Sequence, residues 1–106
     1  MRLAAIDIGS NAARLLINDV IAQPGKPVEF VKVALVRVPL RLGFDVFETG
    51  YISDQRRERM VRTMKAYRLL LDVYEVKHLK ACATSAMRDA QNAEDILREV
   101  KAESGI

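Results

Sequence analysis

The sequence has a single cysteine, Cys82, among its 106 residues. One cysteine cannot form an internal disulfide, and it cannot supply the ligand pairs of a structural zinc site. A disulfide-stabilised scaffold is therefore excluded, and we expect Cys82 to be a small buried apolar side chain. Scarce cysteine is typical of the cytoplasm, which is the expected compartment.

Long hydrophobic runs are also missing. No run approaches the roughly 18 apolar residues that a membrane-spanning helix needs, so we expect no membrane association. The first apolar run, residues 3–8, is short and is interrupted by Asp7. It therefore lacks the uninterrupted hydrophobic region of a signal peptide.

A strong excess of one charge is absent as well. The formal net charge of +3 is mild, so composition does not indicate a nucleic-acid partner. The charges are uneven, however: residues 54–68 are rich in arginine, and residues 89–104 are mainly acidic. A basic helix can attract an anionic partner, but we interpret this one as a solvated face.

The apolar content is sufficient for one folded domain. Half of the residues are hydrophobic and 29% are charged, as in ordinary globular proteins. No internal repeat or low-complexity tract is present. A chain of this length fits one domain, which we predict over residues 1–106.

The most informative stretch is residues 3–11, an apolar run followed by a turn. Asp7 interrupts the run near its end, and Gly9, Ser10 and Asn11 follow as turn-forming residues. A glycine turn can direct backbone N–H groups at a phosphate, and an adjacent aspartate could hold a metal ion or orient a water. The alternative is structural: Asp7 could simply cap the turn through its own backbone.

The remaining pattern predicts an α/β fold with the order β-β-β-α-β-α. The second and third strands are expected over residues 12–21 and 28–38, and residues 40–52 are expected to be irregular. Ser53 is the expected N-cap of a long helix whose buried stripe includes Met60, Met64 and Tyr67. The first three strands are expected to form an antiparallel meander, and a helical crossover then leads to a parallel strand over residues 78–84. A last helix with Asn92 as its N-cap and Gly105 as its C-cap completes a three-layer plan.

A second turn between a strand and a helix covers residues 84–88. Hydroxyl groups at such a turn can cap the helix, or they can bind an anion at the helix N-terminus. Thr84 and Ser85 supply these hydroxyls. The sequence leaves both interpretations open.

Three separated motifs together resemble the exopolyphosphatase/guanosine pentaphosphate phosphatase (Ppx/GppA) family. The first is Ala-Ile-Asp-Ile-Gly-Ser-Asn at residues 5–11 with Arg-Leu-Leu-Ile at residues 14–17. The second is Arg-Leu-Gly at residues 41–43 with Thr-Gly-Tyr-Ile-Ser at residues 49–53. The third is Ala-Thr-Ser-Ala-Met-Arg-Asp-Ala at residues 83–90. A sugar kinase would share the start of the first motif, but the third motif argues against that class.

The resemblance implies a ribonuclease-H-like (actin-like ATPase) fold and a magnesium-dependent hydrolase. Such enzymes release terminal phosphate from inorganic polyphosphate or convert guanosine pentaphosphate to the tetraphosphate. By the resemblance, Asp7 is the catalytic and metal-binding residue. The implied phosphate-binding residues are Gly9, Ser10, Asn11, Arg41, Thr84, Ser85 and Arg88. Arginine suits this role because its planar fork pairs with two phosphate oxygens.

The sequence departs from the family pattern in two ways. Ala12 replaces a serine of the first loop, so one hydroxyl is missing. The family's glutamate-containing segment, its later glycine-rich loop and its second domain are also absent, so the chain resembles an N-terminal subdomain. We therefore expect the isolated chain to be inactive, and an open sheet edge to favour a homodimer. The alternative is a non-catalytic module that binds phosphate, other anions or the rest of a parent chain.

Overall fold

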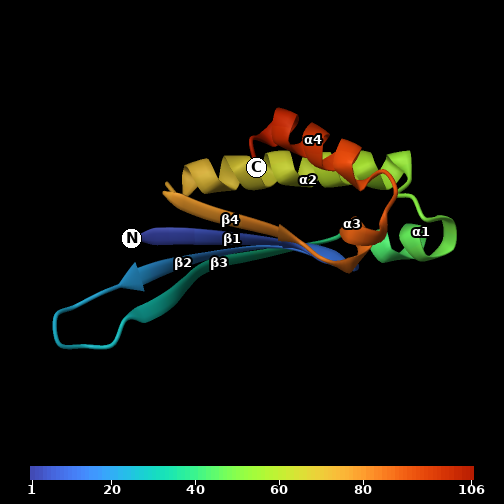
Figure 1. Cartoon of the computed structure of the whole chain (residues 1–106). Helices are drawn as coiled ribbons and strands as arrows, with labels where there is room; N and C mark the ends of the chain where they lie inside the picture. The colour runs from blue at the N-terminus through green and yellow to red at the C-terminus, as the bar shows by residue number, and fades with distance from the viewer.

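The computed structural model describes all of residues 1–106, and a four-stranded sheet is its centre. The strands are β1 (Arg2–Ile8), β2 (Ala12–Ile21), β3 (Glu29–Pro39) and β4 (His78–Ala83). Their spatial order is β3-β2-β1-β4 (Figure 1). β1, β2 and β3 pair in antiparallel fashion, and β4 pairs with β1 in parallel, as the sequence predicted.

The chain has four helices, two more than predicted. They are α1 (Leu42–Thr49), α2 (Asp54–Val73), α3 (Ser85–Asp89) and α4 (Ala93–Ser104). The helices α2 and α4 are the predicted ones, and Ser53 caps α2 as expected by accepting the N–H of Arg56. The prediction that residues 40–52 are irregular was wrong, because α1 occupies most of them. With only eight residues between left-handed Arg41 and Gly50, α1 is too short for a clear helical period.

The helices cover one face of the sheet only. Figure 1 shows α2 and α4 side by side above the strands, and no helix below them. The short helices α1 and α3 lie next to each other at the end of the sheet where β1 and β4 finish. The expected three-layer plan was therefore wrong for these residues, which form two layers and leave one sheet face open. No helix is both long and apolar enough to cross a membrane.

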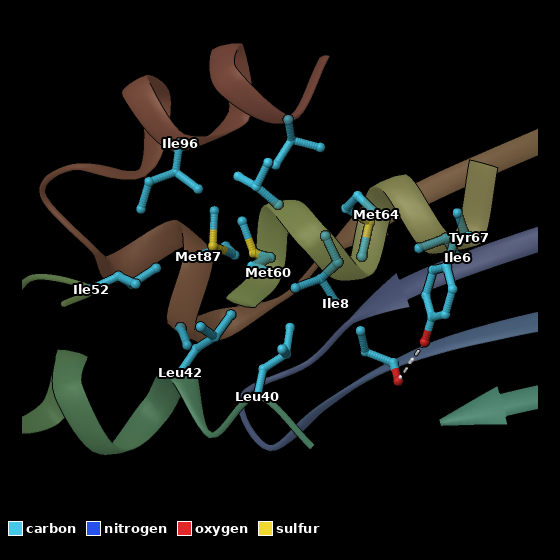
Figure 2. Packing of buried hydrophobic residues seen from close by; sticks show 14 of the residues in the cluster. Ile6, Ile8, Leu40, Leu42, Ile52, Met60, Met64, Tyr67, Met87 and Ile96 are labelled. Carbon is cyan, nitrogen blue, oxygen red and sulfur yellow. Dashed lines mark hydrogen bonds between the residues drawn. The ribbon is translucent and has the colours of Figure 1, made fainter. Parts of the chain in front are cut away.

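The core lies between the sheet and α2. On β1, Ala4, Ile6 and Ile8 point into this core while alternate residues point to the open face. The predicted stripe on α2 is buried, and Figure 2 shows Met60, Met64 and Tyr67 directed at the strands. Cys82 is exposed, so the expectation that it is buried was wrong. It lies on edge strand β4, which has no neighbour on its outer side.

The arginine-rich segment lies on α2 and faces the acidic segment on α4. Arg57 pairs with Glu99 at 2.6 Å, and Lys65 pairs with Glu103 at 2.9 Å. The side chain of α2 residue Arg68 also donates to the carbonyl of Ser104 at 3.0 Å. Exposed ion pairs add little stability, but these explain the opposite charge of the two segments. The arginine-rich helix is thus partly a helix–helix contact rather than only a solvated face.

Candidate phosphate-binding site

Asp7 occupies the exposed face at the end of β1. The alternation that buries Ile6 and Ile8 places the Asp7 carboxylate on the open side of the sheet. A carboxylate in this position remains hydrated, so the apolar strand can carry it without the cost of burying a charge. It is therefore available to a ligand.

The loop that follows β1 is held tightly by the neighbouring chain. Gly9 donates its N–H to the carbonyl of Ala12 at 2.9 Å, which closes the turn. Gly43 donates to the carbonyl of Ser10 at 2.9 Å, and Arg41 donates to the carbonyl of Asn11 at 2.9 Å. The carbonyls of the loop are thus satisfied by the β3–α1 connection, which makes the loop a pre-formed structure.

The N–H groups of Ser10 and Asn11 have no acceptor within the chain. These residues lie between β1 and β2, where no ladder hydrogen bond can use them. Unpartnered N–H groups in a tight turn are suited to an anion. The N–H of Gly9 is not available to an anion, because it is used within the turn. A β-carbon at Gly9 would lie 3.4 Å from the carbonyl oxygen of Ala12.

Asp7 and the loop share a depression of about 230 Å³ with two arginines. In the register of the sheet, Arg14 on β2 lies opposite Asp7 on β1, and Arg37 on β3 lies opposite Arg14. These three side chains form a row across the open face. No salt bridge joins Asp7 to either arginine. The row presents one carboxylate and two cations to the same space, a combination suited to phosphate together with a metal ion.

Arg37 is a candidate that the sequence did not single out, and Arg14 appeared there only within the first motif. Side chains alternate between the two faces of a strand, so the sequence could show that each arginine lies on one face of its own strand. It could not show that the two faces are the same one, because that depends on the register between the strands. Arg14 and Arg37 are far apart along the chain, so only the register across β2 and β3 brings them together.

The remaining predicted site residues do not line this depression. Thr84 is close, because its hydroxyl donates to the carbonyl of Ile8 at 3.1 Å. Arg41 is tied to the loop through its backbone N–H alone. Ser85 and Arg88 are exposed on α3, at the same end of the sheet, and line none of the cavities. The structure thus groups Asp7 with residues 9–11 and leaves the side chains of α3 outside this group.

The donor set for a metal is small. No group of three or more His, Cys, Asp or Glu side chains could hold an ion, and Asp7 is the one carboxylate of the depression. Magnesium is commonly bound through one or two carboxylates, with substrate phosphates and water as the other ligands. Asp7 fits magnesium in that shared arrangement, but it does not fit a metal held by the protein alone.

A network of hydrogen bonds and an ion pair holds the junction of α1 and α2. The Asp45 carboxylate accepts the N–H of Ser53 at 2.9 Å and pairs with the guanidinium of Arg56. Partial burial acts to raise the pKa of Asp45, but the hydrogen bonds from Ser53 and the charge of Arg56 outweigh it and lower that pKa. The side-chain amide of Asn92 bonds both the N–H and the carbonyl of Ile52, at 3.0 Å each. Asn92 therefore binds the α1–α2 connection instead of capping α4, the role that the sequence predicted for its side chain.

The fold and this site together define a class of protein. A three-stranded antiparallel start, a helical crossover to a parallel strand, and an acid at the first hairpin are features of the ribonuclease-H-like, actin-like fold. The chain forms part of such a domain.

Comparison with known proteins gives the family. The sequence pattern of the Ppx/GppA phosphatase family matches residues 20–106. The chain belongs to the Ppx/GppA phosphatase family.

Individual relatives agree with this assignment. Exopolyphosphatase 1 of Mycobacterium tuberculosis is 32% identical over 106 residues, which are 100% of this chain and 30% of the relative. The crystal structure of the Aquifex aeolicus Ppx/GppA family member has a TM-score of 0.89 and 39% identity, covering 100% of this chain and 33% of that one. An exopolyphosphatase from Cytophaga hutchinsonii has a TM-score of 0.90 and 28% identity, covering 100% of this chain and 32% of that one. The chain thus spans about a third of the length of these relatives.

Proposed function

We propose that this chain is the phosphate-holding part of a magnesium-dependent phosphohydrolase that acts on inorganic polyphosphate or guanosine pentaphosphate. One observation carries the proposal: Asp7, the free N–H groups of residues 10 and 11, and two arginines border a single depression. The name of the mycobacterial relative supports inorganic polyphosphate as the substrate. Guanosine pentaphosphate rests on the family resemblance.

Each group has a distinct role in this mechanism. The N–H groups of Ser10 and Asn11 donate to the oxygens of the terminal phosphate. Arg14 and Arg37 neutralise its charge, and their forks can each bond two oxygens. Asp7 would hold a magnesium ion, and that ion would supply further charge stabilisation. The predicted phosphate contacts of Arg41, Thr84, Ser85 and Arg88 stay part of the proposal, although the side chains of these residues do not line the depression.

These residues do not complete a catalytic site by themselves. Phosphoryl transfer is catalysed mainly by positioning and by charges directed at the phosphate from several sides. Here all of the candidate groups lie on one side of the space that the phosphate would occupy. No helix covers this face of the sheet, so nothing in the chain approaches the phosphate from the other side. No general base for the attacking water lines the depression apart from Asp7 itself. We infer that activity requires groups supplied by further protein, as in the longer relatives.

The experiment compares the chain alone with the chain joined to the downstream two thirds of the Aquifex aeolicus relative. Phosphate release is measured from long-chain polyphosphate and from guanosine pentaphosphate, with and without magnesium. We expect activity in the fusion protein only, because loss of a general base alone costs roughly 10²–10⁴-fold in rate. The preferred substrate of the fusion protein then distinguishes the two branches of the proposal.

The unmodified Aquifex aeolicus protein is the control for assay conditions. Strong magnesium-dependent phosphate release by the isolated chain would show that the site is complete. It would contradict the proposal that further protein supplies the missing catalytic groups. A folded fusion protein without activity would favour the alternative of a phosphate-binding module. Ala12→Ser in the fusion protein would then be the first variant to test.

We propose in addition that the chain self-associates through β4. The outer edge of β4 has no partner strand, and an unpaired edge favours pairing with a second copy. Sedimentation velocity should show a mean mass that rises with protein concentration. Ala81→Lys on β4 should suppress this rise, whereas Ala66→Lys on the exposed side of α2 should not. A monomer mass that is independent of concentration would contradict the proposal.

A further inference from the structure

The helix α1 and the turn that follows it expose three aromatic side chains. Phe44, Phe47 and Tyr51 are 61%, 72% and 50% exposed. They are half of the aromatic residues of the chain, which has three phenylalanines, three tyrosines and no tryptophan. We call these three residues the α1 aromatic surface. Exposed apolar groups that cluster in this way commonly mark a binding surface.

This surface adjoins the phosphate loop. A β-carbon built on Gly43 would lie 3.1 Å from ring atom Cε2 of Phe47 and 3.1 Å from the β-carbon of Ser10. Gly43 also donates its N–H to the carbonyl of Ser10. The ring of Phe47 therefore stands beside the loop, separated from it only by the backbone of a glycine.

The aromatic rings are held on a rigid support. Leu42 and Val46 on the opposite side of α1 are buried in the core, where Figure 2 shows Leu42 among the packed side chains. The end of α1 is tied to α3 and α4 because Gln91 donates its N–H to the carbonyl of Gly50 at 2.9 Å. A surface fixed in this way can bind a planar group with little loss of conformational freedom.

The three rings are not equivalent. The guanidinium of Arg56 lies 5.3 Å from the ring centre of Phe44, so one face of that ring is already occupied. Phe47 and Tyr51 have no such partner. Phe47 is both the most exposed ring and the one beside Ser10. It is therefore the ring that a ligand of the loop would meet first.

We propose that Phe47 on α1 is a platform on which a purine base stacks while the phosphates of the same nucleotide occupy the loop; Tyr51 follows shortly after the end of this helix. The proposal rests on the proposed function and deepens it, because it assigns a base-recognition site next to the phosphate site. Stacking on an aromatic side chain requires only a planar base, so every nucleotide with a suitable phosphate chain gains from it. Inorganic polyphosphate has no base and gains nothing.

The test compares two ligands that carry the same three phosphates, guanosine 5′-triphosphate and inorganic tripolyphosphate. Their affinities for the purified chain are measured by isothermal titration calorimetry in the presence of magnesium. We expect the nucleotide to bind about tenfold more tightly, which is at the lower end of what one stacked base contributes. Phe47→Ala should abolish this advantage and leave the affinity for tripolyphosphate unchanged, whereas Phe47→Tyr should retain it.

Phe30→Ala is the matched control, because Phe30 is a 67% exposed phenylalanine on β3 at the far end of the sheet. This variant should keep the full nucleotide advantage. Equal binding of both ligands by the unmodified chain would overturn the platform but leave the phosphate-holding function standing. An advantage that survives Phe47→Ala, or is lost in Phe30→Ala, would also overturn it. Failure of both ligands to bind would overturn the platform and the proposed function together.

Discussion

Replacing Asp7 by asparagine should lower the turnover of the fusion protein by roughly 10²–10⁴-fold, the usual contribution of one essential acid–base or metal-orienting carboxylate. Asparagine keeps the size of the side chain and removes only its charge. The N–H groups of Ser10 and Asn11 and the two arginines stay in place, so phosphate binding should survive in part. The expected signature is therefore a large loss of kcat, together with a requirement for more magnesium.

Asp19→Asn is the matched control for this measurement. Asp7 lies opposite Arg14 in the β1–β2 ladder, and Asp19 lies opposite Arg2 at the other end of the same ladder. Asp19 forms an ion pair with Arg2 at 2.8 Å and is remote from the phosphate loop. Its replacement should leave kcat unchanged. Equal losses in the two variants would mean that Asp7 acts through the stability of the hairpin and not through the reaction.

Replacing Tyr67 by alanine should have the largest effect on stability, about 3–5 kcal/mol for a large buried aromatic side chain. Tyr67 is 1% exposed and connects α2 to the sheet. Its hydroxyl lies 3.1 Å from the carbonyl oxygen of Ala13 and 3.0 Å from that of Val36, and Figure 2 draws one of these two hydrogen bonds. Tyr67→Phe keeps the ring and removes this donor, so it should cost about 1–3 kcal/mol, as for other unsatisfied buried groups. Urea unfolding followed by circular dichroism measures both values.

The pH dependence of the stability tests the hydroxyl of Tyr67 separately from its ring. Burial raises the pKa of Tyr67 from 10.0 to about 12. An acidic group with a raised pKa stabilises the folded state fully below its unfolded pKa, and this contribution is lost as the pH rises through the folded value. The unmodified chain should therefore lose stability between pH 10 and about 12, and Tyr67→Phe should lose less.

The sequence predicted those elements whose signals are local. Short apolar runs located β1 and β2, partial alternation of apolar residues located β3, and the turn at residues 9–11 separated the first two. Ser53 and Gly105 were recognised as helix ends because a side-chain cap and a left-handed glycine are properties of single residues. α1 was missed because it has eight residues and includes Gly43, a residue that usually indicates a loop.

Other errors came from packing that no local pattern reports. Cys82 was expected to be buried because small apolar residues surround it, but burial on an edge strand depends on whether another element covers that edge. Asn92 precedes α4 as predicted, yet its side chain bonds Ile52, which is distant in the chain. In both cases the outcome depends on a neighbour that only the folded chain supplies.

The sequence by itself determined that this protein is an α/β chain of the Ppx/GppA type with Asp7 and a glycine turn at the end of its first strand. Only the tertiary structure decided which side chains share the space in front of that turn. Arg14 and Arg37 meet Asp7 because the strand register aligns them, and a register shift of one residue would turn either arginine to the opposite face. Phe47 lies beside Ser10 because the packing of α1 holds Gly43 against the loop. Register and packing are long-range properties, since they depend on residues that are far apart in the chain.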